Sequence, residues 1–138
     1  MSLITVVGNL TRDPEVKFFE SGTAVVGFAV AENRRYKKGE EWVDADPTYF
    51  EVRAFNGLVD NIASTLHKGD RVVVHGRLQV RHWDKDDGSI GTAVEIIADD
   101  VAPSLRWATC EITKNPKKDS NGGGKGGHGQ PPLDEEPF

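Results

Sequence analysis

The chain has 138 residues, enough for one domain of about 100 residues and a tail, but too few for two ordinary domains. Hydrophobic residues make up 37% of it, and no run approaches the roughly 18 consecutive apolar residues of a membrane-spanning helix. The first residues lack the features of a secretory signal, and the single Cys110 cannot form an internal disulfide. These features favour a cytoplasmic protein that is not bound to a membrane.

The formal net charge is −5, and the excess of acid lies in residues 1–113, which hold 13 basic and 18 acidic side chains. A broad basic surface for nucleic acid is therefore excluded. Any contact with nucleic acid must come from local groups of basic side chains and from stacking, because the field near a surface depends on where the charges lie.

Most of residues 1–113 has the pattern of short strands separated by turn residues. The predicted strands cover residues 3–10 with a continuation over 16–19, then 23–31, 48–55, 71–83 and 90–101. Residues 34–47 should form a polar hairpin extension closed by Asp46-Pro47, and Asp87-Gly88 suits the tip of a second hairpin. A further strand is predicted over residues 104–113.

One segment changes from the period of a strand to that of a helix. Apolar residues recur at helical spacing from Leu58 to Leu66, Asn56 is a candidate N-cap, and Gly69 is a candidate C-terminal stop. Three strands, a short helix and two strands is the order of the OB-fold, a five-stranded Greek-key barrel. The sequence therefore predicts an all-β OB-fold barrel with one short helix and an extra C-terminal strand.

No pattern of catalytic or metal-ligating residues stands out in the sequence. The four histidines are scattered and have no Cys or His partner at zinc spacing. No nucleophile elbow or EF-hand loop is present. The carboxylates of residues 84–88 are better explained as a solvated hairpin tip than as a cation site. We therefore expect no catalytic residue, no metal and no cofactor.

Aromatic residues alternate with basic ones on the predicted strands and hairpins. Single-stranded nucleic acid needs both, because cations follow the phosphates and flat rings stack on bases, at about 1–3 kcal/mol per base. Phe28 and Phe50 are expected in the core or a subunit interface instead. The candidate binding residues are Arg34, Arg35, Tyr36, Lys37 and Trp42 in the first hairpin, Tyr49 and Phe55 on the third strand, and Arg77, Arg81 and Trp83 on the fourth.

Four segments resemble the bacterial single-stranded DNA-binding proteins, and together they span residues 3–107. They are Val7-Gly8-Asn9-Leu10-Thr11-Arg12-Asp13-Pro14-Glu15-Val16, Val30-Ala31-Glu32-Asn33, Lys68-Gly69-Asp70-Arg71-Val72 and Gly76-Arg77-Leu78-Gln79-Val80-Arg81-His82-Trp83. The resemblance implies an OB-fold subunit that assembles, usually as a homotetramer, and is wrapped by single-stranded DNA. Its place would be the nucleoid, in replication, recombination and repair.

The resemblance also assigns roles to single positions. The stacking aromatic positions fall on Tyr49, Phe55 and Trp83, and one that is often aromatic falls on Arg34. The basic phosphate-contact positions fall on Lys17, Lys37, Lys68 and Arg81. Glu51 and Gly57 occupy two further positions that are often basic in the family. Residues 104–109 resemble the actinobacterial branch, in which an added strand clamps two subunits together.

Residues 114–138 are predicted to form a disordered, glycine-rich linker with an acidic tip. The tip is Asp134, Glu135, Glu136, Pro137 and Phe138. It resembles the family's C-terminal end, although Glu136 replaces the usual apolar residue. A terminal Phe with its free carboxylate suits an apolar pocket ringed by basic side chains on a replication or repair partner. The alternative is a tail that only keeps the protein soluble. The tail is shorter than in many members, which fits a specialised paralogue.

Two other functions remain as hypotheses at this stage. The chain could be an OB-fold assembly or partner-binding module with weak DNA affinity, which the acidic barrel and Glu51 would favour. It could also be a small hydrolase or nuclease. Whether the assembly is a dimer or a tetramer does not follow from the sequence.

Overall fold

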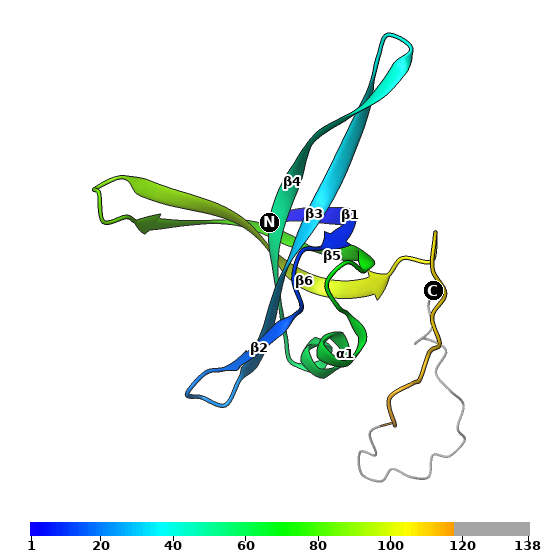
Figure 1. Ribbon diagram of the computed structural model, residues 1–138. Helices are drawn as coiled ribbons and strands as arrows, with labels where there is room; N and C mark the ends of the chain where they lie inside the picture. The colour runs from blue at the N-terminus through cyan, green and yellow to red at the C-terminus, as the bar shows by residue number, and fades with distance from the viewer. Residues whose placement is uncertain (118–138) are drawn as a thin grey trace.

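Six strands and one helix make up most of residues 1–117, the part of the chain that this computed structural model describes (Figure 1). The elements are β1 (Ser2–Leu10), β2 (Glu15–Phe18), β3 (Ala24–Lys38), β4 (Glu41–Phe55), α1 (Gly57–Thr65), β5 (Arg71–Asp84) and β6 (Ile90–Pro103). All the strands predicted before residue 104 are present, and so is the single helix.

The strands form one sheet that closes on itself. The order is β1-β5-β6-β4-β3-β2, and β1 also pairs with β3 at Asn9 and Leu10. The β4–β6 pairing is parallel, and all the others are antiparallel. Because β1 and β2 both pair with β3, they act as one strand broken at residues 11–14. This connectivity is that of the five-stranded OB-fold, as the sequence predicted.

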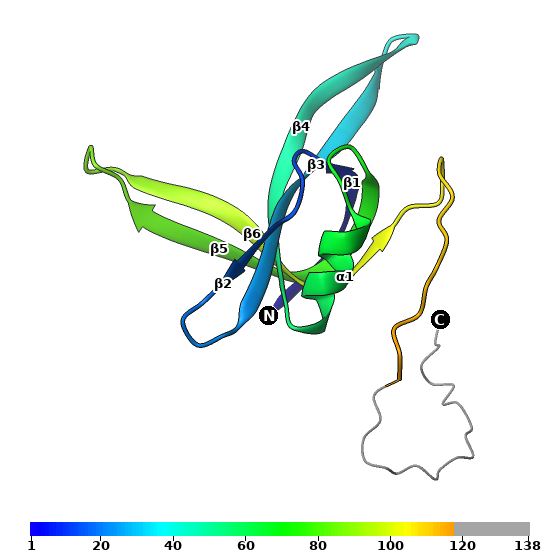
Figure 2. The same ribbon diagram turned by 60° about the horizontal axis from the view of Figure 1, so that its bottom comes forward.

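Two long hairpins leave the barrel in different directions (Figures 1 and 2). The β3–β4 arm consists of residues 33–46, and the β5–β6 arm of residues 79–94. The prediction that Asp46-Pro47 closes the first arm is wrong, because both residues lie inside β4. A register shift between Glu32 and Arg34 faces them. Proline is tolerated there because a bulge frees a residue from the ladder of hydrogen bonds.

The tip of the β5–β6 arm is a tight turn, as predicted from Asp87-Gly88. The backbone N–H of Lys85 donates to Ser89 O at 2.8 Å, and that of Gly88 donates to Lys85 O at 3.0 Å. The Asp87 carboxylate accepts hydrogen bonds from the Ser89 hydroxyl at 2.6 Å and the Ser89 N–H at 2.9 Å, and these lower the pKa of Asp87.

The core fills the barrel with alternate side chains of every long strand. Phe28, Val52 and Ile96 are fully buried, and Phe50 packs partly buried against the same cluster. Helix α1 adds Val59 and Ile62 and covers one end of the barrel (Figure 2). Phe28 is therefore a core residue, as expected.

The ends of α1 differ from the prediction. Asn56 precedes the helix, but its side chain makes no capping hydrogen bond, and its φ of 58° places it in the left-handed region. The helix ends at Thr65, where the N–H of Leu66 donates to Ile62 O at 3.0 Å. Gly69 lies in the turn before β5 and does not end the helix.

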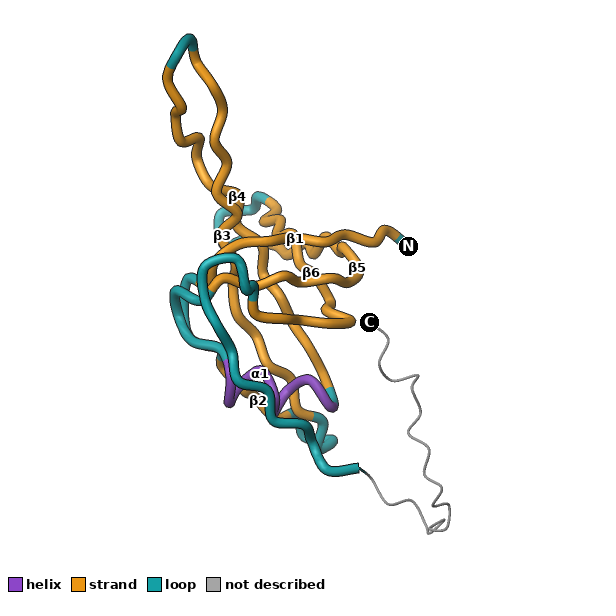
Figure 3. Tube along the Cα trace, turned by 90° about the vertical axis from the view of Figure 1, so that its right-hand side faces the viewer, coloured by secondary structure: helices purple, strands orange, loops and turns teal. Residues whose placement is uncertain are grey.

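The strand predicted over residues 104–113 is not formed in this single chain (Figure 3). The N–H of Ser104 still donates to Arg71 O at 2.8 Å, but the residues after it have no strand assignment up to residue 117. A strand exists only where a neighbouring edge accepts its hydrogen bonds. Within residues 1–117, no such edge lies beside this segment.

Gly8 allows β1 to approach β3 where the barrel closes. A Cβ atom added there would lie 2.4 Å from Ala31 O, a backbone atom that cannot move aside cheaply. We expect Gly8→Ala to lower the free energy of unfolding by about 2 kcal/mol, measured by urea denaturation at fixed protein concentration. Gly57→Ala is the matched control, since no atom lies within 4 Å of its added Cβ. Equal stabilities for the two variants would contradict this account of the closure.

Candidate nucleic-acid interface

One face of the sheet carries many of the candidate binding side chains, because residues on a strand alternate between its two sides. On β4, Val52 and Ala54 are buried in the core, so Arg53 lies on the opposite side. The register places Glu51 beside Glu95, and Glu95 beside Gln79. This outer face therefore continues across β4, β6 and β5. Its members are Tyr49, Glu51, Arg53, Phe55, Gly91, Ala93, Glu95, Ile97, Arg77, Gln79, Arg81 and Trp83.

A buried carboxylate lies at the centre of the outer face. Glu95 is only 2% exposed. Arg81 Nε donates to its Oε2 at 2.7 Å, and Arg53 Nη1 lies 3.5 Å from its Oε1. Glu95 was not among the residues selected from the sequence. The only signal was an acidic residue inside the apolar run Val94-Glu95-Ile96-Ile97, which does not indicate what faces it.

The ion pair of Arg12 with Glu51 lies beside the Glu95 carboxylate, and both residues line a shallow hollow. Arg12 Nη2 donates to Glu51 Oε1 at 3.1 Å, so Glu51, which replaces a basic residue of the family pattern, is neutralised from within the chain. The hollow has a volume of about 410 Å³. Its lining includes Lys17 from β2 together with Arg53 and Arg81. With Arg12, four cations thus line one depression on the outer face, together with the carboxylates of Glu15, Glu51 and Glu95.

Two of the three aromatic rings of the interface, those of Phe55 and Trp83, have an arginine over them. The guanidinium carbon of Arg53 lies 5.7 Å from the centre of the Phe55 ring, and that of Arg81 lies 5.2 Å from the Trp83 ring. Tyr49 is 63% exposed and Trp83 is 40% exposed. None of these rings fills the barrel interior. The predicted combination of cation and π-face is present, with both parts on the same surface.

Trp83 lies flat on the sheet because its neighbour has no side chain. Gly91 pairs with Trp83 across β5 and β6, and a Cβ atom added to Gly91 would lie 2.4 Å from Cε2 of the indole. The ring thus covers the glycine and remains 40% exposed. Sequence reasoning did not identify Gly91, since its partner strand was not known.

The basic and aromatic residues of the β3–β4 arm divide between its two sides. Lys37 pairs with Trp42, and Arg35 pairs with Asp44 through an ion pair of 3.2 Å. Tyr36 and Arg34 alternate with these residues, so they lie on the other side of the ribbon. All the predicted residues of the arm are exposed. The candidate residues of this arm therefore fall on two opposite sides of the ribbon, and no flat surface can contact both sides together.

The remaining predicted residues lie at the margins or outside the described part. Arg77 is exposed on the outer face beside Ile97. Lys68 lies in the turn after α1, and its backbone N–H donates to Asp13 Oδ1 at 2.8 Å. Neither lines the hollow. The tip residues Asp134 to Phe138 lie outside residues 1–117.

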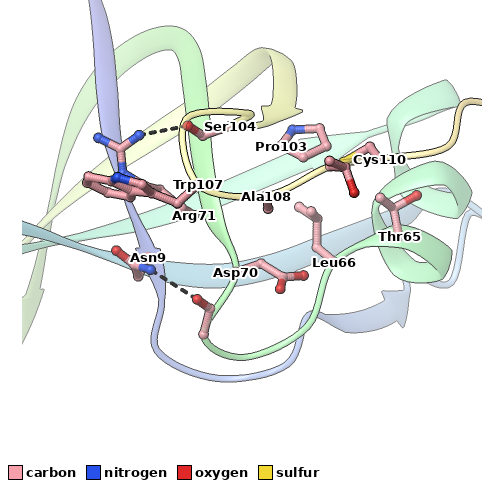
Figure 4. A pocket seen from close by; sticks show the side chains of 12 residues that line it. Asn9, Thr65, Leu66, Asp70, Arg71, Pro103, Ser104, Trp107, Ala108 and Cys110 are labelled. Carbon is pink, nitrogen blue, oxygen red and sulfur yellow. Dashed lines mark hydrogen bonds between the residues drawn. The ribbon is translucent and has the colours of Figure 1, made fainter.

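The segment after β6 turns back over the end of the barrel near Asn9 (Figure 4). Trp107 stacks on Arg71 at 4.7 Å, while Arg71 Nη1 donates to Ser104 Oγ at 2.7 Å. Trp107 nevertheless remains largely exposed, as does Leu105. This end of the barrel is distinct from the outer face.

The structure shows neither a metal cluster nor a membrane helix within residues 1–117. No group of three or more His, Cys, Asp and Glu side chains is placed there to hold a metal ion. No helix in that range is long and apolar enough to cross a membrane.

The single-strand binding protein family model matches residues 1–104, which is most of the chain. The chain belongs to this family. The single-stranded DNA-binding protein of Mycobacterium leprae is 41% identical over 113 residues, which cover 80% of this chain and 67% of the relative. That of Paenarthrobacter aurescens is 36% identical over 126 residues, covering 90% and 74%. Both organisms are actinobacteria, in agreement with the resemblance found in the sequence.

Solved structures of family members share the fold. The small single-stranded DNA-binding protein of Streptomyces coelicolor superposes with a TM-score of 0.67 at 34% identity, covering 75% of this chain and 94% of that chain. A Plasmodium falciparum SSB in complex with ssDNA gives 0.66 at 24% identity, which supports the fold alone.

The contact between Gly91 and Trp83 predicts a measurable change in the indole. In a chain where Trp42 and Trp107 are replaced by Phe, Gly91→Val should push the indole off the sheet. Acrylamide should then quench Trp83 fluorescence about twice as strongly. Thr92→Val is the control, because residue 92 lies on the other side of β6. An unchanged quenching constant in Gly91→Val would contradict this placement of the ring.

Proposed function

We propose that this protein binds single-stranded DNA across the outer face, with bases stacked on Tyr49, Phe55 and Trp83. The observation that carries the proposal is that Tyr49 and Trp83 are exposed and Phe55 is partly exposed beside Arg53 and Arg81 on one continuous surface. Stacking accepts every base, so the binding should tolerate any sequence. The names of the relatives, single-stranded DNA-binding proteins, support the same function.

The phosphates would follow the exposed cations around the outer face. Lys17, Arg77 and Arg81 lie on it or at its margin, and Lys37 and Arg35 extend the path along one side of the β3–β4 arm. These groups offset the acidic net charge locally, where the strand would pass. Trp42, with Arg35 at 5.9 Å from its ring, would add a stacking surface far from the barrel.

The proposed cellular role is to coat and protect single strands during replication, recombination and repair, without turnover of a substrate. The acidic tip of residues 134–138 would recruit partner proteins through the terminal Phe138 and its carboxylate. Residues 114–138 would act as the linker to this tip.

Assembly into a homotetramer is part of the proposal. The β1 edge is paired on one side only from Ser2 to Gly8, with β5, so its other side can accept a second copy. Leu105, Trp107 and Ile112 expose apolar surface on a segment that lacks a strand partner in the single chain. A neighbouring subunit would supply the missing edge.

One observation favours the second candidate, an assembly module that binds DNA weakly. Arg12, Arg53 and Arg81 are all engaged by Glu51 or Glu95, so phosphates must compete with carboxylates that are already in place. A dissociation constant above about 10 μM for oligo-dT at low salt would favour this candidate, because phosphate contacts should then be at their strongest.

Removal of two stacking rings tests the proposed function. The double variant Tyr49→Ala/Trp83→Ala should weaken oligo-dT binding by at least about thirtyfold, since each stacked base contributes roughly 1–3 kcal/mol. Fluorescence anisotropy of a labelled oligonucleotide measures the change. Phe18→Ala is the control, because Phe18 is an exposed aromatic on the opposite side of β2 from Lys17. Equal affinities for wild type and double variant would refute the stacking assignment.

The proposed assembly has its own measurement. Oligo-dT of increasing length is titrated while the mass of the complex is recorded by light scattering. We expect four chains per complex and a protein-to-DNA ratio that falls as the oligonucleotide lengthens, because wrapping uses several subunits. A monomeric mass with and without DNA would contradict the tetramer and leave the stacking test unaffected.

A further inference from the structure

The Glu95 carboxylate has one oxygen that the described part of the chain leaves without a hydrogen bond. Oε2 accepts from Arg81 Nε, whereas Oε1 has no hydrogen-bond partner within residues 1–117. Arg53 contributes only an ion-pair contact of 3.5 Å. A buried acceptor without a partner costs free energy that an apolar residue at this position would avoid. A ligand that donates a hydrogen bond to Oε1 would recover this free energy.

The neighbours of this oxygen define what could meet it. Glu51, Glu95 and Gln79 lie side by side in register across β4, β6 and β5, so a row of side-chain oxygens crosses the middle of the outer face. Tyr49 and Arg53 flank the row on β4. A base stacked on a flanking ring would present its edge to Glu95 Oε1, because both oxygens of Glu51 already accept hydrogen bonds from Arg12. Carboxylates accept hydrogen bonds from exocyclic amino groups, such as N4 of cytosine, which thymine lacks.

We propose that Glu95 reads the amino group of one base of the bound strand and favours cytosine over thymine at that position. The inference rests on the proposed function, because it needs the strand on the outer face. It adds a base preference to a surface that stacking alone would leave indifferent to sequence.

Arg53 controls access to the oxygen. Its guanidinium covers Oε1, yet the Arg53 side chain is 36% exposed, and within residues 1–117 the guanidinium contacts only Glu95 and the Phe55 ring. A phosphate beside the hollow would attract this guanidinium and uncover Oε1. Arg81 would stay in place, since its Nε bond to Oε2 is short and direct. The Glu95 carboxylate would then keep its hydrogen bond from Arg81 and accept a second one from the base.

The variant Glu95→Gln should change the preference between cytosine and thymine in a defined direction. The amide oxygen takes over the bond from Arg81 Nε, so the amide N–H groups occupy the place of Oε1. A donor there suits O4 of thymine and repels the amino group of cytosine. The affinities for oligo-dC and oligo-dT of equal length are measured at slightly alkaline pH, where cytosine stays neutral. We expect the dC-to-dT affinity ratio to fall about fivefold in Glu95→Gln relative to wild type.

Glu51→Gln is the matched control, because it removes the same charge from the same face and leaves Glu95 in place. General electrostatics would raise the affinity for both oligonucleotides together and leave their ratio unchanged in both variants. A ratio that does not change in Glu95→Gln, or that falls equally in Glu51→Gln, overturns the proposal. Failure of wild type to bind either oligonucleotide would instead overturn the proposed function.

A second measurement uses wild-type protein only and so does not depend on the folding of a variant. An oligonucleotide in which hydrogen replaces the amino group of every cytosine should bind about fivefold more weakly than oligo-dC. The modified base keeps the ring and the O2 carbonyl, so stacking is retained. Equal binding of the two oligonucleotides by wild-type protein would refute base reading by Glu95.

Discussion

The short parallel contact between β4 and β6 is the constraint on which the interface depends. It spans only Glu51 to Arg53 on β4, yet it joins the β3–β4 and β5–β6 hairpins, which are distant in the chain. On its inner side Val52 meets Ile96 in the core. On its outer side Arg53 meets Glu95. Core packing and the geometry of the interface are thus set by the same few backbone hydrogen bonds.

The arginines of the outer face form ion pairs with carboxylates and do not make an excess of positive charge. The chain is acidic overall, and carboxylates lie among the arginines that would contact phosphates. Such pairs hold the guanidinium groups in defined positions and limit repulsion between them before DNA arrives. The carboxylates of these pairs also compete with the phosphates for the arginines. A strand would therefore be held largely by stacking, with the cations guiding its path.

The two arms give the molecule its reach. The β3–β4 arm and the β5–β6 arm extend past the barrel in different directions and carry Trp42 and Trp83 (Figure 1). Each ring has an arginine guanidinium beside it, 5.9 Å from the ring centre of Trp42 and 5.2 Å from that of Trp83, and each ring remains exposed. The segment after residue 103 extends the chain at a separate end of the barrel. A strand and a second subunit can therefore be accommodated on different surfaces.

The sequence by itself determined the order of the strands along the chain, the alternation on β4 and the hairpin tip at Gly88. These features follow from local patterns, namely the two-residue period of a strand and the residue types of a tight turn. It also determined the family, through motifs that stand intact along the chain. Only the tertiary structure decided that Glu95 lies between Arg53 and Arg81, that Trp83 covers Gly91, and that residues 104–113 lack a strand partner. Each of these depends on which distant strand pairs with which and in what register, and no local pattern contains that information.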